Sequence, residues 1–143
     1  MGKEINLLAA YPKSKRNIQE RDSQKTEEDR SLARKFGKEF FDGNRKYGYG
    51  GFKYNKKYWR NVTKEMIKYY SLNNKSTILD VGCAKGFMLY DFKKHLPKAK
   101  VVGIDISRYA VNNSKKEVKK FLKVGNAKYL KFKDSLFFFK KKT

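Results

Sequence analysis

Two short apolar segments, each followed by a turn and a helix, constrain the fold of this chain more than any other feature. Thr77–Val81 and residues 101–106 have the length and β-branched content of buried strands. Helical stretches follow at residues 87–96 and 109–122, and residues 127–132 are predicted as a third strand. This alternation predicts an α/β fold with parallel strands and right-handed crossovers.

The turn after the first strand has the composition of a ligand-binding loop. Gly82 and Gly86 flank it, and glycine permits a positive φ and close approach of a ligand to the backbone. The helix that follows directs free N–H groups at the turn. Asp105 lies 19 residues beyond Gly86, near the spacing at which an acidic residue meets ribose hydroxyls. The sequence therefore predicts a nucleotide-type cofactor at the carboxyl ends of the strands.

Three ordered motifs resemble those of the class I S-adenosylmethionine-dependent methyltransferases. Residues 78–86 are similar to the first motif of that family, residues 103–107 to the second and residues 125–127 to the third. The resemblance covers roughly residues 59–134 and implies a Rossmann-like three-layer sandwich around a parallel sheet. Residues 58–70 have the apolar spacing of a helix preceding that sheet.

The resemblance also implies a cofactor, S-adenosyl-L-methionine, and the residues that hold it. Asp80 and the loop residues Gly82, Cys83, Ala84 and Gly86 would cradle the methionine part of the cofactor. Asp105 would hold the ribose hydroxyls, Ile106 would flank the adenine ring, and Asn126 would face the adenine amino group.

Two of these residues depart from the family pattern. Ala84 stands where the middle glycine of the first motif is usual, and Asn126 stands where Asp is commoner. An Asn carbonyl still accepts a hydrogen bond from an amino group. We expect weakened contact with the adenine at this position.

Two other interpretations compete for the same loop. A dinucleotide dehydrogenase is disfavoured, because residues 83–86 do not fit the G-x-G-x-x-G spacing and Asp80 precedes the first glycine. A generic Rossmann-like turn, with Asp80 as a local cap, is the other. The sequence identifies no catalytic base: His95 is expected on the surface far from the strand ends, and Cys83 is expected as a small filler.

The composition bears on partners and compartment. There are 36 Lys and Arg against 14 Asp and Glu, a formal charge of +22, which favours either a solvated Lys-rich surface or polyanion binding. The alternative function is therefore a basic nucleic-acid-binding module in which Tyr47, Tyr49, Phe52 and Tyr54 stack on bases. One Cys and one His argue against a metal site and for a reducing compartment. With no signal peptide or membrane span in the sequence, we expect a cytoplasmic protein.

The chain divides into three parts. Residues 1–57 are predicted as a basic arm followed by a Gly/aromatic lid. In this lid Tyr47, Tyr49 and Tyr54 would close over the cofactor, together with Trp59 at the start of the next part. Residues 58–134 are predicted as the cofactor-binding half of a methyltransferase domain. Residues 135–143 are predicted as an aberrant Phe/Lys tail from a frameshift or truncation, the alternative being a natural half-domain that completes its sheet with a partner chain.

The sheet is thus expected to be incomplete, with about three strands, and its unpaired edge predicts association. The methyl acceptor is not identified by the sequence. A small molecule or sugar is favoured, and RNA is also left open.

Overall fold

A computed structural model describes residues 2–130 and, for the backbone, residues 137–140. Its centre is a four-stranded parallel sheet with the strand order β3-β2-β1-β4. The strands are β1 (Thr77–Val81), β2 (Lys100–Asp105), β3 (Leu122–Val124) and β4 (Phe137–Lys140). This order matches four strands of a doubly wound sheet, with the change of direction between β1 and β4. The expected incomplete Rossmann-like α/β fold is confirmed.

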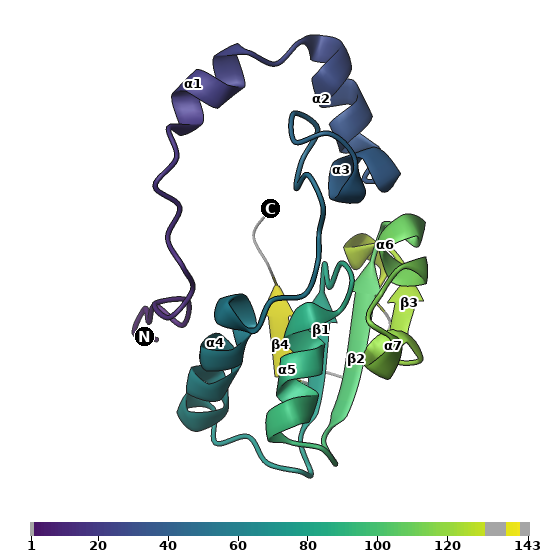
Figure 1. Cartoon of the computed structure of the whole chain (residues 1–143). Coiled ribbons are helices and arrows are strands. Elements are labelled where there is room, and N and C mark those ends of the chain that lie inside the picture. Colours follow the sequence, from purple (N-terminus) through teal and green to yellow (C-terminus); the bar gives the residue numbers. More distant parts are fainter. Residues whose placement is uncertain (1, 131–136, 141–143) are drawn as a thin grey trace.

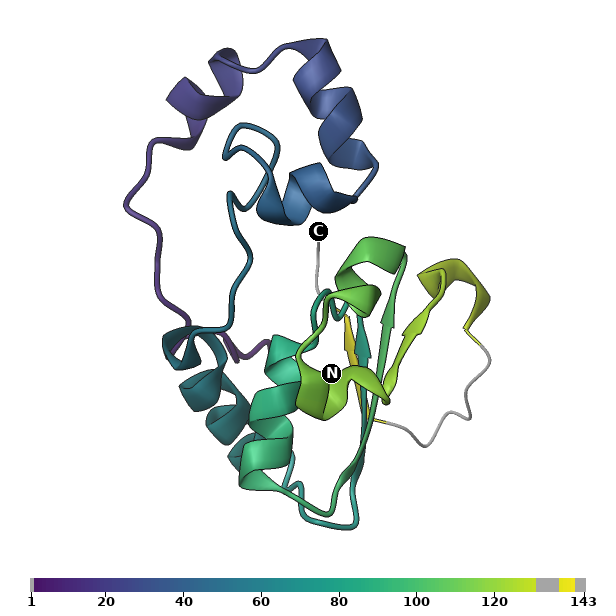
Figure 2. The same cartoon turned by 45° about the vertical axis from the view of Figure 1, so that its right-hand side comes forward.

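Three helices cover one face of the sheet. Figures 1 and 2 show α4 (Lys56–Tyr69), α5 (Phe87–His95) and α7 (Lys116–Lys119) on the same side of the strands. The core between these layers contains side chains with 0% relative exposure, among them Val62, Met66, Ile78, Leu89 and Phe92. The helices predicted for residues 58–70 and 87–96 are therefore present, each with one buried face.

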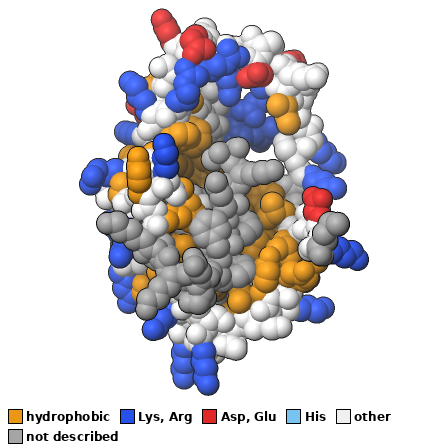
Figure 3. All heavy atoms as spheres, turned by 180° about the vertical axis from the view of Figure 1, so that it is seen from behind, with side chains coloured by type: hydrophobic (Ala, Val, Ile, Leu, Met, Phe, Trp, Pro, Cys, Tyr) orange, Lys and Arg blue, Asp and Glu red, His pale blue; other side chains and the backbone are white. Residues whose placement is uncertain are grey.

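The strand side chains alternate between the two faces of the sheet, as the pleat requires. Ile78 and Val101, paired in register, contribute to the core under the helices. Leu79, Val81 and Ile104 form a smaller apolar cluster, with Val102 and Leu130 packed against it. Viewed from behind, the molecule shows hydrophobic side chains toward its middle and Lys and Arg scattered around its rim (Figure 3).

The third strand was placed wrongly by the sequence pattern. The predicted helix over residues 109–122 is instead two short helices, α6 (Arg108–Asn112) and α7, and the chain returns to the sheet earlier, at β3. Leu122 pairs with Gly103 and Val124 with Asp105. Residues 127–132 lie beyond this ladder: Ala127–Tyr129 form a 3₁₀ turn, and residues 131 and 132 lie outside the described residues.

The tail contributes a strand. The backbone of β4 pairs in parallel with β1, with Phe137 opposite Ile78 and Lys140 opposite Val81. The sheet therefore has four strands where about three were expected, because the aromatic run has high β-propensity and β1 offers it a free edge. The aberrant origin suggested for residues 135–143 stays a prediction.

The N-terminal part runs in an arc beyond the carboxyl end of the sheet (Figures 1 and 2). Its first two helices, α1 (Ile18–Ser23) and α2 (Glu27–Arg34), consist of exposed and half-buried residues. The third, α3 (Lys38–Asp42), lies in the segment predicted as a Gly/aromatic lid, and its Phe41 is buried. In the described part of the chain, the helices are too short or too polar to cross a membrane.

Candidate cofactor site

The loop after β1 is held in a tight left-handed shape. Gly82, Ala84 and Gly86 have φ values of +81°, +49° and +77°. Glycine adopts such angles freely, whereas a residue with a Cβ is strained there. The requirement at Ala84 explains why glycine is usual at this point of the motif. The loop is anchored to β2 because the amides of Gly82 and Cys83 donate to the Ile104 carbonyl at 2.7 and 3.1 Å.

Asp105 connects the end of β2 to this loop. Its Oδ2 accepts a hydrogen bond from the Ala84 amide at 2.7 Å, and its Oδ1 accepts one from the Ser107 amide at 2.8 Å. The side chain is nearly buried, at 9% relative exposure, on the wall of a cavity. A carboxylate has about four lone-pair positions, so these two bonds leave capacity for a ligand.

That cavity lies at the carboxyl end of the sheet and has a volume of about 540 Å³, within the range of small-molecule sites. Its floor and walls come from three strand ends: Val81, Gly82 and Ala84 after β1, Ile104, Asp105 and Ile106 at β2, and Gly125, Asn126 and Ala127 after β3. Its other side, which we call the roof, comes from the N-terminal part: Phe36, Phe40, Phe41 and Tyr49. The cavity is therefore built jointly by the sheet and the predicted lid.

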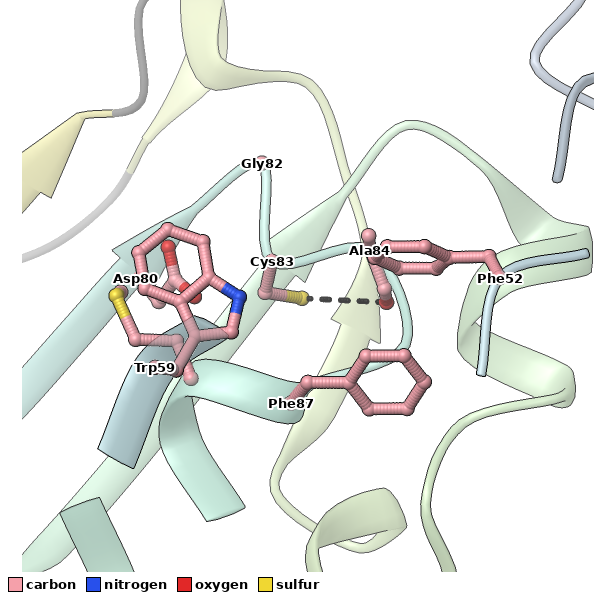
Figure 4. Close-up of a pocket in the computed structure, with 8 residues that line it drawn as sticks. Phe52, Trp59, Asp80, Gly82, Cys83, Ala84 and Phe87 are labelled. Carbon is pink, nitrogen blue, oxygen red and sulfur yellow. Dashed lines mark hydrogen bonds between the residues drawn. The ribbon is translucent and has the colours of Figure 1, made fainter. Parts of the chain in front are cut away.

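A second, much smaller cavity lies under the loop. It holds about 20 Å³, enough for roughly one water. In Figure 4 the Trp59 indole and Asp80 lie on one side of Cys83, and Phe52 and Phe87 lie on the other. Burial raises the pKa of the Cys83 thiol, so it is held as the protonated, unreactive form. The filler role expected for Cys83 agrees with this packing.

The roof is tied to the helical layer by a continuous series of aromatic contacts. Ring centroids are 5.8 Å apart between Phe41 and Tyr49, 4.2 Å between Tyr49 and Phe52, and 4.8 Å between Phe52 and Phe87 of α5. Burial raises the pKa of the Tyr49 phenol, and electrostatic repulsion from Tyr11 and Asp105 raises it further. The rings thus pack against one another and form one wall of the site.

Asp42, at the end of α3, is the polar centre of the same region. Its carboxylate accepts hydrogen bonds from Lys85 Nζ at 2.9 and 2.7 Å, from the Tyr109 hydroxyl at 2.7 Å and from the Phe52 amide at 2.9 Å. Burial opposes ionisation of Asp42, but the hydrogen bonds from Lys85, Tyr109 and Phe52 outweigh it and hold its pKa below the usual value. Asp42 is a carboxylate bound to three separate segments.

The structure brings most of the predicted cofactor residues to these two cavities. Gly82, Ala84, Asp105, Ile106 and Asn126 line the large cavity, whereas Asp80 and Cys83 line the small one beside it. Their contact with a cofactor stays a prediction.

Gly86 and Asn126 also have roles within the chain. Gly86 is the N-cap of α5, and a Cβ there would lie 2.9 Å from Val118 and 3.0 Å from Leu122, so this glycine permits close packing of the helix. The Oδ1 of Asn126 accepts a hydrogen bond from the Lys128 amide at 2.9 Å and caps the 3₁₀ turn. The amide nitrogen and the second lone pair of Oδ1 remain for a ligand.

The residues predicted to form the lid lie in different places. Tyr49 lines the large cavity and Trp59 lines the small one. Tyr54 donates instead to the buried Asp91, at 2.7 Å, and Tyr47 lies beside Lys46 on the surface. The sequence reasoning missed the roof residues Phe36, Phe40 and Phe41 and the carboxylate of Asp42; the signal was an acid between aromatic residues and a glycine in an otherwise basic segment.

The rings named for the nucleic-acid alternative are largely committed to packing. Tyr49 and Phe52 stack on each other, and Tyr54 contacts Phe87 and Tyr90. His95 lies at the end of α5 remote from the strand tips, with its Nε2 3.0 Å from the Arg60 carbonyl. Among the described residues, the His, Cys, Asp and Glu side chains form no cluster suited to a metal ion.

The strand order, the left-handed loop and the acid at the end of β2 are the arrangement expected of a Rossmann-like fold. Residues 72–137 match the model of a family described as "Methyltransferase domain". The resemblance to methyltransferases is therefore confirmed over this segment of the chain.

Other comparisons add less. None of the curated proteins matches the chain. A solved structure described as "Crystal structure of MccD protein" is 35% identical over 52% of this chain and 36% of that chain, with a TM-score of 0.45. The chain thus covers about a third of the length of that structure.

Proposed function

We propose that this chain holds the cofactor-binding part of an enzyme that transfers a methyl group from S-adenosyl-L-methionine to an acceptor. The observation that carries the proposal is the placement of Asp105 and the left-handed loop on one wall of the 540 Å³ cavity. The family match over residues 72–137 supports the reaction class.

The residues present suit this cofactor. A Cβ built on Gly82 would meet open space among the described residues, so the backbone of the loop faces room for a ligand. Asp105 has carboxylate oxygens for two vicinal hydroxyls, and Ile106, 60% exposed, presents an apolar surface for a purine ring at the cavity wall. Asn126 would offer an adenine ring its amide nitrogen as a donor and the second lone pair of its Oδ1 as an acceptor, since Oδ1 accepts one bond from Lys128.

The bound cofactor supplies a sulfonium methyl group that is attacked directly by a nucleophile of the acceptor. The part played by this chain is positioning and exclusion of water. The loop and Asp105 would fix the cofactor from below, and the aromatic roof would shield it from above. With this arrangement, the enzyme needs no covalent intermediate on its own side chains.

We favour a small molecule or a sugar as the acceptor over a long polymer, because the aromatic roof lies across the cavity from the strand ends. A single buried free Cys suits a cytoplasmic location. The edge strands of the sheet favour association with a second chain.

A binding panel tests the cofactor class. The chain is titrated with S-adenosylhomocysteine, with NAD⁺ and with a single-stranded RNA oligonucleotide at two salt concentrations. We expect binding of S-adenosylhomocysteine alone. Preference for NAD⁺ would identify the dehydrogenase alternative, and RNA binding with a steep salt dependence would identify the nucleic-acid module.

A further inference from the structure

We infer that Asp42 is a positioning residue that fastens the aromatic roof to the cofactor loop through Lys85. The inference rests on the proposed function for its consequence in cofactor binding, but the contact itself is independent of any cofactor. The two residues are 43 positions apart in sequence and come from the two halves of the cavity.

The Asp42–Lys85 pair is well shielded for an ion pair. The side chains are 24% and 8% exposed, and both carboxylate oxygens lie within 2.9 Å of Nζ. The ammonium also donates to the Phe52 carbonyl at 2.9 Å, while the Phe52 amide donates to Asp42. Acid, amine and backbone therefore form one closed hydrogen-bonded unit, in which each charge is compensated.

The position of this unit links the roof to the cofactor contacts. Asp42 ends α3 one residue after Phe41, which lines the roof, and Lys85 follows Ala84, whose amide bonds Asp105. Tyr109 adds a connection from α6, and the Ser107 hydroxyl donates to the Phe36 carbonyl at the other end of the roof. A shift of the roof is thus transmitted to the loop that would cradle the cofactor.

The N-terminal part contains a natural control. Asp29 and Lys46 form a second Asp–Lys pair, 3.1 Å apart, but both residues belong to the N-terminal part itself. Removing that pair changes the same kind of charge without touching the connection to the sheet. Asp29→Asn also keeps a side-chain oxygen for the cap of α2.

Hydrogen exchange of the full chain without cofactor tests the fastening. Asp42→Asn and Lys85→Met are expected to speed exchange of the amides at residues 36–52 by about tenfold or more. A tenfold change is the effect expected from losing one hydrogen bond between charged groups. The double variant should exchange no faster than either single one, and Lys85→Arg, which keeps a cation, should recover part of the protection.

Two controls accompany these variants. Exchange in α5 and β1 should be unchanged, which shows that the variants fold. Asp29→Asn removes a bond to Lys46, which lies in the same segment, so this control is compared at the amides of α3, which should exchange at the wild-type rate.

Unchanged exchange at residues 36–52 in both single variants would overturn the inference, as would an equal effect of Asp29→Asn or simple additivity in the double variant. Titration with S-adenosylhomocysteine then tests the consequence: the affinity of Asp42→Asn should fall by about tenfold. If the wild-type chain does not bind S-adenosylhomocysteine but the exchange results hold, the fastening stands and the proposed cofactor is wrong.

Discussion

The floor and the roof of the cavity are built by different means. The floor is made by β1, β2 and β3, whose backbones are paired and whose side chains on one face join the core under the helices. The roof is a five-residue helix and a glycine-rich loop, held by stacked rings and by the bonds of Asp42. Where a cavity wall lacks strand pairing, a few specific contacts determine its position, and those contacts become the sensitive points.

The largest expected difference between the two walls is in global stability. Phe92→Ala, which removes a ring with 0% exposure beneath the floor, should lower the free energy of unfolding by about 3–5 kcal/mol. Phe41→Ala removes a ring of equal size from the roof and should cost less than half as much, because the roof can open while the sheet stays folded. Urea unfolding measures both. Equal losses would show that the roof and the floor unfold as one unit.

Two glycine substitutions compare how tightly the two walls are packed, with a smaller expected effect. A Cβ on Gly103 of β2 would lie 2.8 Å from Cys83 Sγ and 2.9 Å from Leu89 Cδ1. Gly103→Ala should therefore destabilise the chain by about 1–3 kcal/mol through overpacking. Gly37→Ala, at the start of the roof where a Cβ meets open space among the described residues, is the control and should cost less than about 1 kcal/mol. If the control costs more in thermal unfolding, the floor is not the tighter wall.

The strain in the loop should be removable. Ala84 has φ +49°, and the left-handed region costs a residue with a Cβ about 1–2 kcal/mol. Ala84→Gly relieves that cost but adds freedom to the unfolded chain, so the net gain should be about 0.5–1 kcal/mol. The amide bond to Asp105 should persist. A lower melting temperature in Ala84→Gly would mean that the loop is not strained.

The smallest effect concerns pH and is confined to the roof. The pKa of Asp42 in the folded chain is below its unfolded value of about 3.9, so its stabilisation is complete above that value and is lost as pH falls through the folded pKa. Pepsin cleavage near Phe40 should therefore increase relative to cleavage in α5 as pH is lowered below about 3.9. Asp42→Asn should already be cleaved faster at higher pH and show no such step. An identical step in that variant would assign it to another group.

The same contrast explains how much the sequence could predict. Thr77–Val81 is a strand bounded as expected, because apolar residues before a glycine turn have few alternatives. Asp105 was found by its spacing from Gly86. The roof was predicted only as a segment: its aromatic content predicted packing or a lid. The bonds of Asp42 to Lys85 and Tyr109, and of Phe36 to Ser107, join residues 43 to 71 positions apart, which no local pattern reveals. The position of β3 was missed because the break between α6 and α7 gives no strong local signal.

The most direct test of the central claim is calorimetry of the chain with S-adenosylhomocysteine, comparing wild type, Asp105→Ala and Asp22→Ala. Asp22 is an exposed acid of α1, remote from the cavity, and controls for the loss of one negative charge. The account predicts micromolar binding by wild type and Asp22→Ala, and loss of binding in Asp105→Ala. Binding of equal strength in all three, or in none of them, would contradict it.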